Sequence, residues 1–151
     1  MAEIAFYHLS NVPLEKVLPV LLQKTLDADK RAVVIVGTEE RVDALSSLLW
    51  TANPDSWLPH GSAKDGRPEQ QPIWITTRTE NPNQATFLFL TDGASAESLD
   101  GFERCFDLFD GTNDNAVQAA RNRWTTLKEA GYSRTYWQQS EQGNWKKKES
   151  P

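Results

Sequence analysis

Hydrophobic residues follow two different spacings in turn along the chain, and this alternation predicts strands followed by helices. Residues 2–9 are rich in β-favouring side chains and indicate a first strand. Residues 13–29 place valines and leucines at helical spacing, and Pro19 inside this pattern predicts a kink or an adjusted boundary. Residues 31–38 form a continuous β-branched run, which is typical of a strand covered on both faces.

A second helix is predicted directly after this run. Thr38 can cap it, and Glu39 and Glu40 in its first turn suit the positive end of the helix dipole. Its apolar face is expected to consist of Val42, Leu45 and Leu49. The next segment, residues 51–71, is rich in proline, glycine and polar residues, and it predicts a long surface loop.

The rest of the chain continues the same alternation. The expected elements are strands at 72–77 and 85–93, a short helix followed by a strand or turn at 100–111, a helix at 115–129 with Gly131 as its left-handed cap, and a final edge strand at 133–139. Strands alternating with helices predict a single α/β domain with a mainly parallel central sheet flanked by helices. Residues 33–36 are expected to form one of its inner strands.

Composition and charge narrow the class of protein. The 151 residues are 38% hydrophobic and 25% charged, which is usual for one soluble globular domain. We expect no signal peptide and no membrane span, because no apolar run approaches the roughly 18 residues required. Cys105 is the single cysteine and lies in a segment predicted to be buried, so a reducing, cytoplasmic location is expected. The net charge of −5 argues against broad, non-specific binding of nucleic acid.

Motifs for catalysis or cofactor binding are missing from the sequence. The turn after the second predicted strand has Gly37 alone where a dinucleotide-binding fold has several glycines, and there is no phosphate-binding loop. Two histidines and one cysteine, far apart in the chain, do not form a zinc motif. His8 and His60 are interpreted as ordinary strand and loop residues, and Asp92 as a turn residue. We therefore expect no cofactor, no metal and no catalytic site.

The helix predicted at 115–129 carries cations beside an aromatic ring at the edge of its apolar face. On a helical wheel, the buried stripe consists of Val117, Ala120, Trp124 and Leu127. Arg121 and Lys128 fall next to Trp124, at about 40° and 20° from Val117. In one interpretation their methylene stems lie on the core and their charges reach into water. In the other they rim a shallow apolar pocket that suits an acidic peptide with a hydrophobic C-terminal residue.

Aromatic rings beside cations also suit single-stranded nucleic acid. A direct single-stranded nucleic-acid-binding module is therefore the alternative function, although the net acidity of the chain weakens it. Lys146, Lys147 and Lys148 lie apart from the predicted helix. Residues 146–151 are interpreted as a short, disordered basic tail after a domain that covers 1–145.

Three segments of the sequence together resemble one known family. They are "FYHL" near the start, "RAVVIVGTEERVDALSSLLWTANPDSWLPHG" in the middle and "ARNRWTTLKEAGY" in the last predicted helix. Each segment is weak alone, but in order and at fitting spacing, from about Ala5 to Trp145, they resemble the chi subunit of bacterial DNA polymerase III. The resemblance implies a Rossmann-like α/β fold without nucleotide binding, and a non-catalytic place in the clamp-loader assembly.

The resemblance also implies partners. Chi proteins link a partner subunit, psi, to the acidic, Phe-ending C-terminal tail of single-stranded-DNA-binding protein, so contact with DNA would be mostly indirect. Carried over by position, the tail-binding residues are Arg121, Trp124, Thr125 and Lys128. The psi-facing residues are Trp50, Trp57, Leu58, Pro59 and His60. The family pattern often has a lysine at the position of Thr125, so the cationic rim is expected to be weaker here. Trp50 sits about 100° from Leu49 on the wheel, which permits its exposure.

Overall fold

A seven-stranded sheet forms the centre of the computed structural model, which describes residues 2–51, 58–142 and 144–150. In chain order the elements are β1 (Glu3–Leu9), α1 (Leu14–Asp27), β2 (Ala32–Ile35), α2 (Glu39–Thr51), the 3-10 helix η1 (Pro68–Gln70), β3 (Ile73–Thr76), β4 (Phe87–Leu90), β5 (Arg104–Asp110), α3 (Asp114–Glu129), β6 (Ser133–Gln139) and β7 (Trp145–Lys148).

The strand order in the sheet is β3-β2-β4-β5-β1-β6-β7. All neighbours pair in parallel except β6 and β7. The predicted α/β class with a mainly parallel sheet is confirmed.

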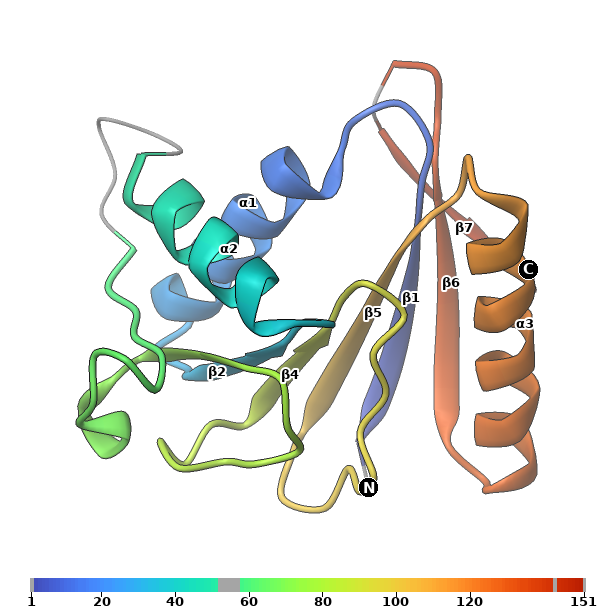
Figure 1. Ribbon diagram of the computed structural model, residues 1–151. Coiled ribbons are helices and arrows are strands. Elements are labelled where there is room, and N and C mark those ends of the chain that lie inside the picture. Colours follow the sequence, from blue (N-terminus) through green and yellow to red (C-terminus); the bar gives the residue numbers. More distant parts are fainter. Residues whose placement is uncertain (1, 52–57, 143, 151) are drawn as a thin grey trace.

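Helices cover both faces of this sheet (Figure 1). α1 and α2 lie on one face, where Leu18, Leu22 and Leu45 join the core cluster built on Phe89 and Phe106. α3 lies on the opposite face, where its partly buried stripe packs against a second cluster. No helix in the described ranges is both long and apolar enough to cross a membrane.

The β-branched run after the first helix forms the strand that its pattern predicts. β2 is buried along its whole length because it lies between β3 and β4 and has side chains packed on both faces. The strand ends at Ile35, and Val36 remains buried just beyond it. The prediction of an inner strand here is confirmed.

The predicted helix caps are also confirmed. The Thr38 hydroxyl oxygen accepts a hydrogen bond from the Arg41 backbone N–H at 3.2 Å, at the start of α2. Gly131 follows α3 with φ of 86°, a left-handed conformation that costs glycine little. α1 continues through Pro19, so this proline does not mark a helix boundary.

The segment at 100–111 corrects one prediction, because it contains β5 and no helix. β5 is buried from Cys105 to Phe109 and is paired on both sides, with β1 and β4. Asp107 inside this run breaks the apolar pattern that identifies a central strand. Its charge is accommodated because Arg123 of α3 reaches it with two hydrogen bonds, of 2.6 and 2.9 Å.

The 51–71 segment is less exposed than a surface loop would be. Leu58, His60, Gly61 and Ser62 are all buried. Gly61 pairs with Trp74 alongside β3, donating to the Ile73 carbonyl and accepting from the Ile75 N–H, each at 3.0 Å. This part of the chain therefore acts as a short extension of the sheet, and the prediction of a surface loop is wrong for it.

The C-terminal residues give two further corrections. β6 is not an edge strand, because β7 pairs with it in antiparallel register. Lys146–Lys148 belong to β7, so the prediction of a disordered tail is wrong for these three residues. Trp145 anchors the strand by packing edge-on against Tyr7, with ring centroids 5.0 Å apart.

Candidate functional site: the α3 margin and its surroundings

Local sequence signals fix α3 on the sheet. Asn113 caps its N-terminus by accepting a hydrogen bond from the Ala116 N–H at 3.1 Å. Ala120 is fully buried, and Val117, Trp124 and Leu127 pack partly buried against the same core cluster. The helical wheel therefore identified the inner stripe correctly, and the residues beside Trp124 lie at its border with solvent.

Trp124 is a core residue on one side and a surface residue on the other. Its ring packs edge-on against Phe6 of β1 at 5.3 Å and Tyr136 of β6 at 5.9 Å between centroids. The guanidinium of Arg134 lies over the same ring, 4.1 Å from its centroid. Arg134 also donates from Nη1 to the Trp124 carbonyl oxygen at 3.0 Å. The ring and this cation thus hold α3 and β6 together.

Arg134 lies over this ring, and Arg121 and Lys128 lie beside it on α3 by helical spacing, three residues before and four residues after Trp124. We call Arg121, Trp124, Lys128 and Arg134 the α3 margin. Among the described residues, no carboxylate lies within 4.0 Å of the charged nitrogens of these cations. Thr125 is exposed beside them and donates its hydroxyl to the Arg121 carbonyl oxygen at 3.1 Å. The margin therefore combines half-buried aromatic surface with positive charge that no carboxylate of the described residues neutralises.

Two ring side chains beneath the margin are affected by the charge of Arg121. Burial raises the pKa of Tyr136 to about 12, and the nearby Arg121 guanidinium opposes this shift. Burial also lowers the pKa of His8, with a smaller contribution from Arg121 in the same direction. His8 hydrogen-bonds through Nδ1 to the Tyr136 hydroxyl, so the two rings form one polar unit below Arg121.

Arg134 is a residue that sequence reasoning missed. A signal was present, because positions 134 and 136 of β6 point to the same face of the sheet and Tyr136 is buried on the α3 side. The contact between Arg134 and Trp124 depends, however, on how α3 lies against β6. That placement cannot be read from the spacing of residues within either element.

A second aromatic surface lies at the end of α2. Trp50 is 54% exposed, and its ring packs at a tilted angle against the ring of His60, with centroids 4.2 Å apart. His60 is buried; it donates from Nδ1 to the Leu58 carbonyl oxygen at 2.7 Å and approaches Ser46 with Nε2 at 3.1 Å. Pro59 is half-buried. We call Trp50, Leu58, Pro59 and His60 the Trp50 patch. Trp57, the remaining psi-facing residue predicted from the resemblance, lies outside the described residues.

An apolar groove adjoins the Trp50 patch between α1 and α2. It has a volume of about 710 Å³. Apolar side chains that include Val20, Leu48 and Leu58 line it, and Glu15, Lys16 and Lys24 also border it. Val20 is 54% exposed, although the helical pattern of α1 gave no reason to single it out. Buried Leu58 and His60 therefore support an apolar surface of which Trp50 and Val20 are the most exposed large members among the described residues.

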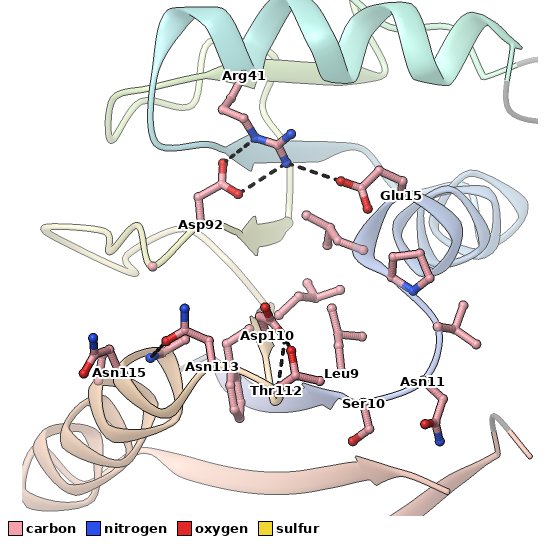
Figure 2. A pocket seen from close by; sticks show the side chains of 18 of the residues that line it. Leu9, Ser10, Asn11, Glu15, Arg41, Asp92, Asp110, Thr112, Asn113 and Asn115 are labelled. Carbon is pink, nitrogen blue, oxygen red and sulfur yellow. Dashed lines mark hydrogen bonds and ion pairs between the residues drawn. The ribbon is translucent and has the colours of Figure 1, made fainter. Parts of the chain in front are cut away.

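A polar crevice lies elsewhere, at the carboxyl ends of β1 and β5 (Figure 2). β1 continues into α1 on one face of the sheet, and β5 continues into α3 on the other. Open α/β sheets commonly bind ligands at such a switch point. The crevice has a volume of about 670 Å³, and polar side chains such as Ser10, Asn11 and Asn115 line it.

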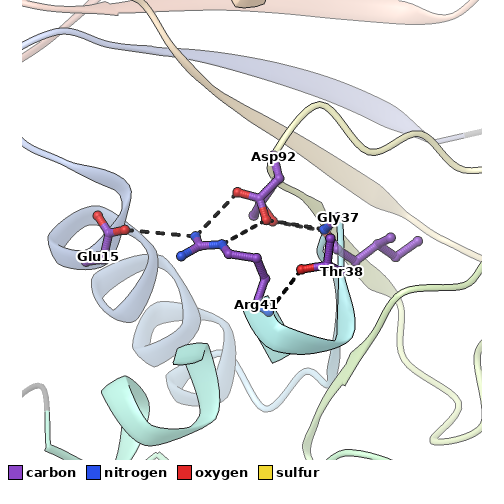
Figure 3. A network of polar contacts seen from close by, with 7 residues as sticks. Glu15, Gly37, Thr38, Arg41 and Asp92 are labelled. Carbon is purple, nitrogen blue, oxygen red and sulfur yellow. Dashed lines mark hydrogen bonds and ion pairs between the residues drawn. The ribbon is translucent and has the colours of Figure 1, made fainter. Parts of the chain in front are cut away.

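Both guanidinium groups of this crevice are already paired inside the protein. Arg41 donates to the two carboxylate oxygens of Asp92 at 3.1 and 3.3 Å and lies 3.9 Å from Glu15 (Figure 3). Asp92 also accepts from the Gly37 N–H at 3.2 Å. Arg123 is held by buried Asp107. Among the described residues that line the crevice, each guanidinium is therefore bonded to a carboxylate of the same chain.

His8, His60 and Asp92 have structural partners of their own. His8 bonds Tyr136, His60 bonds the Leu58 carbonyl, and Asp92 holds Arg41 from a turn with φ of 57°. The interpretation of these three as strand, loop and turn residues is confirmed. No group of three or more potential metal-binding side chains is found within the described ranges. Cys105 is buried in β5.

Comparison with known proteins agrees with the resemblance seen in the sequence. Residues 1–135 match the model of the family described as "DNA polymerase III chi subunit, HolC". A protein of Rickettsia prowazekii (strain Madrid E), named "Probable DNA polymerase III subunit chi", is 32% identical over 90 residues. The aligned part covers 60% of this chain and 54% of the relative, so the match spans about half of that protein's length. This chain belongs to the family of DNA polymerase III chi subunits, which are replication accessory subunits.

Proposed function

We propose that this chain is a non-catalytic adaptor in the DNA polymerase III clamp-loader assembly of the bacterial cytoplasm. It would link a psi subunit to the acidic C-terminal tail of single-stranded-DNA-binding protein. The observation that carries this proposal is the α3 margin, where three cations surround a half-buried ring without a carboxylate partner among the described residues. An acidic peptide supplies carboxylates with which these cations can pair.

The margin offers different contacts to different parts of such a tail. Arg121 and Lys128 are exposed and free to pair with its carboxylates, including the terminal one. The outer part of the Trp124 ring offers an apolar wall for a terminal Phe. Arg134 is already oriented by the Trp124 carbonyl, so it adds positive charge at a fixed position. Contact with DNA is delegated to the partner, which fits the net charge of −5.

The Trp50 patch is the proposed psi surface. Buried aromatic residues commonly contribute much of the energy of an interface, about 2 kcal/mol or more on truncation. Trp50 offers the exposed ring, while His60 and Leu58 hold it from beneath. Trp57, just before Leu58, is included in this proposal on the family resemblance alone.

The tail site is tested by calorimetric titration with the tail peptide at two salt concentrations. A charge-assisted hydrogen bond is worth about 1.5–3 kcal/mol, so Arg121→Ala or Lys128→Ala is expected to weaken binding roughly ten- to a hundredfold. A peptide that lacks the final Phe is the matched ligand control. Wild-type affinity in both variants, or equal affinity for the control peptide, would contradict the site.

The psi surface is tested by co-purification with a co-expressed psi subunit. Trp50→Ala and Trp57→Ala are expected to abolish co-purification while the melting temperature stays near that of the wild type. Val20→Ser, on the neighbouring groove, maps how far the surface extends. If Trp50→Ala unfolds the protein, the ring is a core residue and this part of the proposal fails.

A further inference from the structure

The strand β7 brings a second group of cations to the face of the sheet on which α3 lies. In the antiparallel pairing, Lys148 stands opposite Tyr136 and Lys146 opposite Gln138. Directly paired residues of neighbouring strands point to the same face, and Tyr136 packs on the α3 side. Lys146 and Lys148 therefore share a face with the α3 margin.

Lys147 points the opposite way. It stands opposite Trp137, which packs with Tyr7 and Trp145 on the face of α1. The contact of Trp145 with Tyr7, at 5.0 Å between ring centroids, fixes this alternation at the start of the strand. One strand thus offers two lysines to the α3 side and one to the opposite side.

We call the strip of surface between the α3 margin and β7, on the α3 side of the sheet, the trough. Its floor is the α3-facing row of β6, Arg134, Tyr136 and Gln138, of which Tyr136 is buried. β7 is the outermost strand, next to β6 (Figure 1). Arg121 is near enough to the floor to act on the pKa of Tyr136. From Arg134 to Gln138 the floor covers four steps along an extended strand, about 13 Å. This length matches about four residues of an extended peptide.

The charge along the trough is strongly one-sided. Lys146 and Lys148 are exposed, and neither lies within 4.0 Å of a carboxylate among the described residues. They line a hollow of about 360 Å³ with Gln138. Glu141, in the turn before β7, is the acidic residue that also lines this hollow. With the α3 margin, five cations therefore border the trough from two sides.

We propose that the trough binds an extended acidic peptide across its whole width, with Lys146 and Lys148 pairing with carboxylates upstream of the residues held by Arg121 and Trp124. The inference rests on the proposed function, since the same acidic tail is the occupant. Charge complementarity favours it, and the length of the floor sets how many acidic residues can be engaged. The lysines of β7 are then part of the tail site.

Lysine on an edge strand also has a simpler role, because it discourages pairing with the edge of another sheet. That role does not depend on which face a lysine occupies, so Lys147 would serve it as well as its neighbours. Lys147 therefore provides a control with the same charge, in the same strand, on the opposite face.

The experiment is a calorimetric titration of the full protein with two peptides, the complete acidic tail and its last three residues. Exposed ion pairs are worth up to about 1 kcal/mol each, so Lys146→Ala with Lys148→Ala is expected to weaken binding of the complete tail roughly five- to twentyfold. The same double variant is expected to bind the three-residue peptide like the wild type. Lys147→Ala is expected to bind both peptides like the wild type.

The outcomes separate this inference from the function on which it rests. If Arg121→Ala weakens binding but the β7 double variant does not, the tail site stands and the trough is wrong. Equal losses for Lys147→Ala and the double variant indicate diffuse attraction and also overturn it. If the double variant loses affinity for a single-stranded oligonucleotide and not for the tail, the lysines serve nucleic acid and the inference fails. If the wild type does not bind the tail, both proposals fall.

Discussion

The switch-point crevice and the α3 margin hold arginines in opposite situations. In the crevice, Arg41 and Arg123 are each bonded to a carboxylate of the same chain. At the margin, Arg121 and Arg134 have no such carboxylate among the described residues, although Arg134 bonds a backbone carbonyl. The crevice lies at the switch point of the sheet, where open α/β folds commonly bind ligands. The margin lies elsewhere, but its positive charges are available to pair with a ligand.

This difference shows that position in the fold does not by itself identify the surface whose charge is available to a ligand. A paired guanidinium stabilises the protein that contains it, and a ligand would have to displace its carboxylate first. A guanidinium without a carboxylate partner can donate hydrogen bonds to the carboxylate of a ligand without first breaking an ion pair. The net charge of −5 hides this distinction, because it counts the acids that neutralise the crevice together with the cations of the margin.

The largest expected effect concerns the crevice, where the arginines are paired with carboxylates. Asp107 is 3% exposed, and Asp107→Asn leaves the largely buried charge of Arg123 without its partner. Removal of one member of a buried pair costs about 3–5 kcal/mol of the free energy of unfolding. Urea denaturation measures this loss.

Two controls accompany that variant. Asp92→Asn removes the partner of the more exposed Arg41 and is expected to cost about 1 kcal/mol or less. Replacing both Asp107 and Arg123 by leucine is expected to recover most of the stability, because no unpaired charge remains. A loss for Asp107→Asn no larger than that for Asp92→Asn would contradict the difference between buried and exposed pairs.

The second prediction compares the two tryptophans of the candidate surfaces. Trp124→Ala removes contacts with Phe6 and Tyr136, so it is expected to cost about 2–4 kcal/mol of unfolding free energy. Trp50→Ala is expected to change stability by less than about 1 kcal/mol, since the ring is 54% exposed. Thermal denaturation of both variants checks this. Equal losses would mean that the rings have equal structural roles.

Elements whose pattern is local were predictable from the sequence. The buried run of β2, the cap of α2 by Thr38 and the inner stripe of α3 all follow from neighbouring residues. The position of Arg121 and Lys128 beside Trp124 followed from the same helical spacing. For these features the structure adds distances but does not change the interpretation.

Features that depend on distant partners were not predictable in this way. The segment that contains β5 was predicted to begin with a short helix, because Asp107 interrupts its apolar run, and Arg123, which pairs with Asp107, is 16 residues away. β7 looked like a solvated tail because its lysines acquire a fixed direction only through pairing with β6. His60 looked like a surface residue, although its bonds to Leu58 and Ser46 bury it.

The third prediction concerns the α3 margin, to which a variant adds one more cation. Thr125 occupies an exposed position on α3 between Arg121 and Lys128. Thr125→Lys is expected to strengthen binding of the acidic tail, by up to about fivefold, because an exposed ion pair contributes up to about 1 kcal/mol. Titration at two salt concentrations measures it, and the gain is expected to shrink at higher salt. Thr126→Lys, one residue further along, is the matched control, since Thr126 lines a different hollow, together with Asn122 and Leu99.

The smallest expected effect concerns His8, which lies beneath the margin. Burial lowers the pKa of His8, Arg121 of α3 adds to the shift, and Gly111 and Asp110 oppose it. A histidine whose folded-state pKa lies below its unfolded value, about 6.5, contributes stability that is complete above that value. The contribution is lost as the pH falls through 6.5 towards the folded-state pKa, by at most about 1.4 kcal/mol per pH unit.

Protonation of His8 is also expected to affect tail binding, but it increases the affinity while it decreases the stability. A protonated His8 adds a cation beside Arg121, so affinity for an acidic peptide rises as the pH falls below about 6.5 towards the folded-state pKa, while stability falls. His8→Gln removes the titrating group and is expected to flatten both pH profiles relative to the wild type. Denaturation and titration across this pH range measure the two slopes. If affinity and stability change in the same direction, or if the profiles of His8→Gln match those of the wild type, the charge of His8 does not reach the tail site.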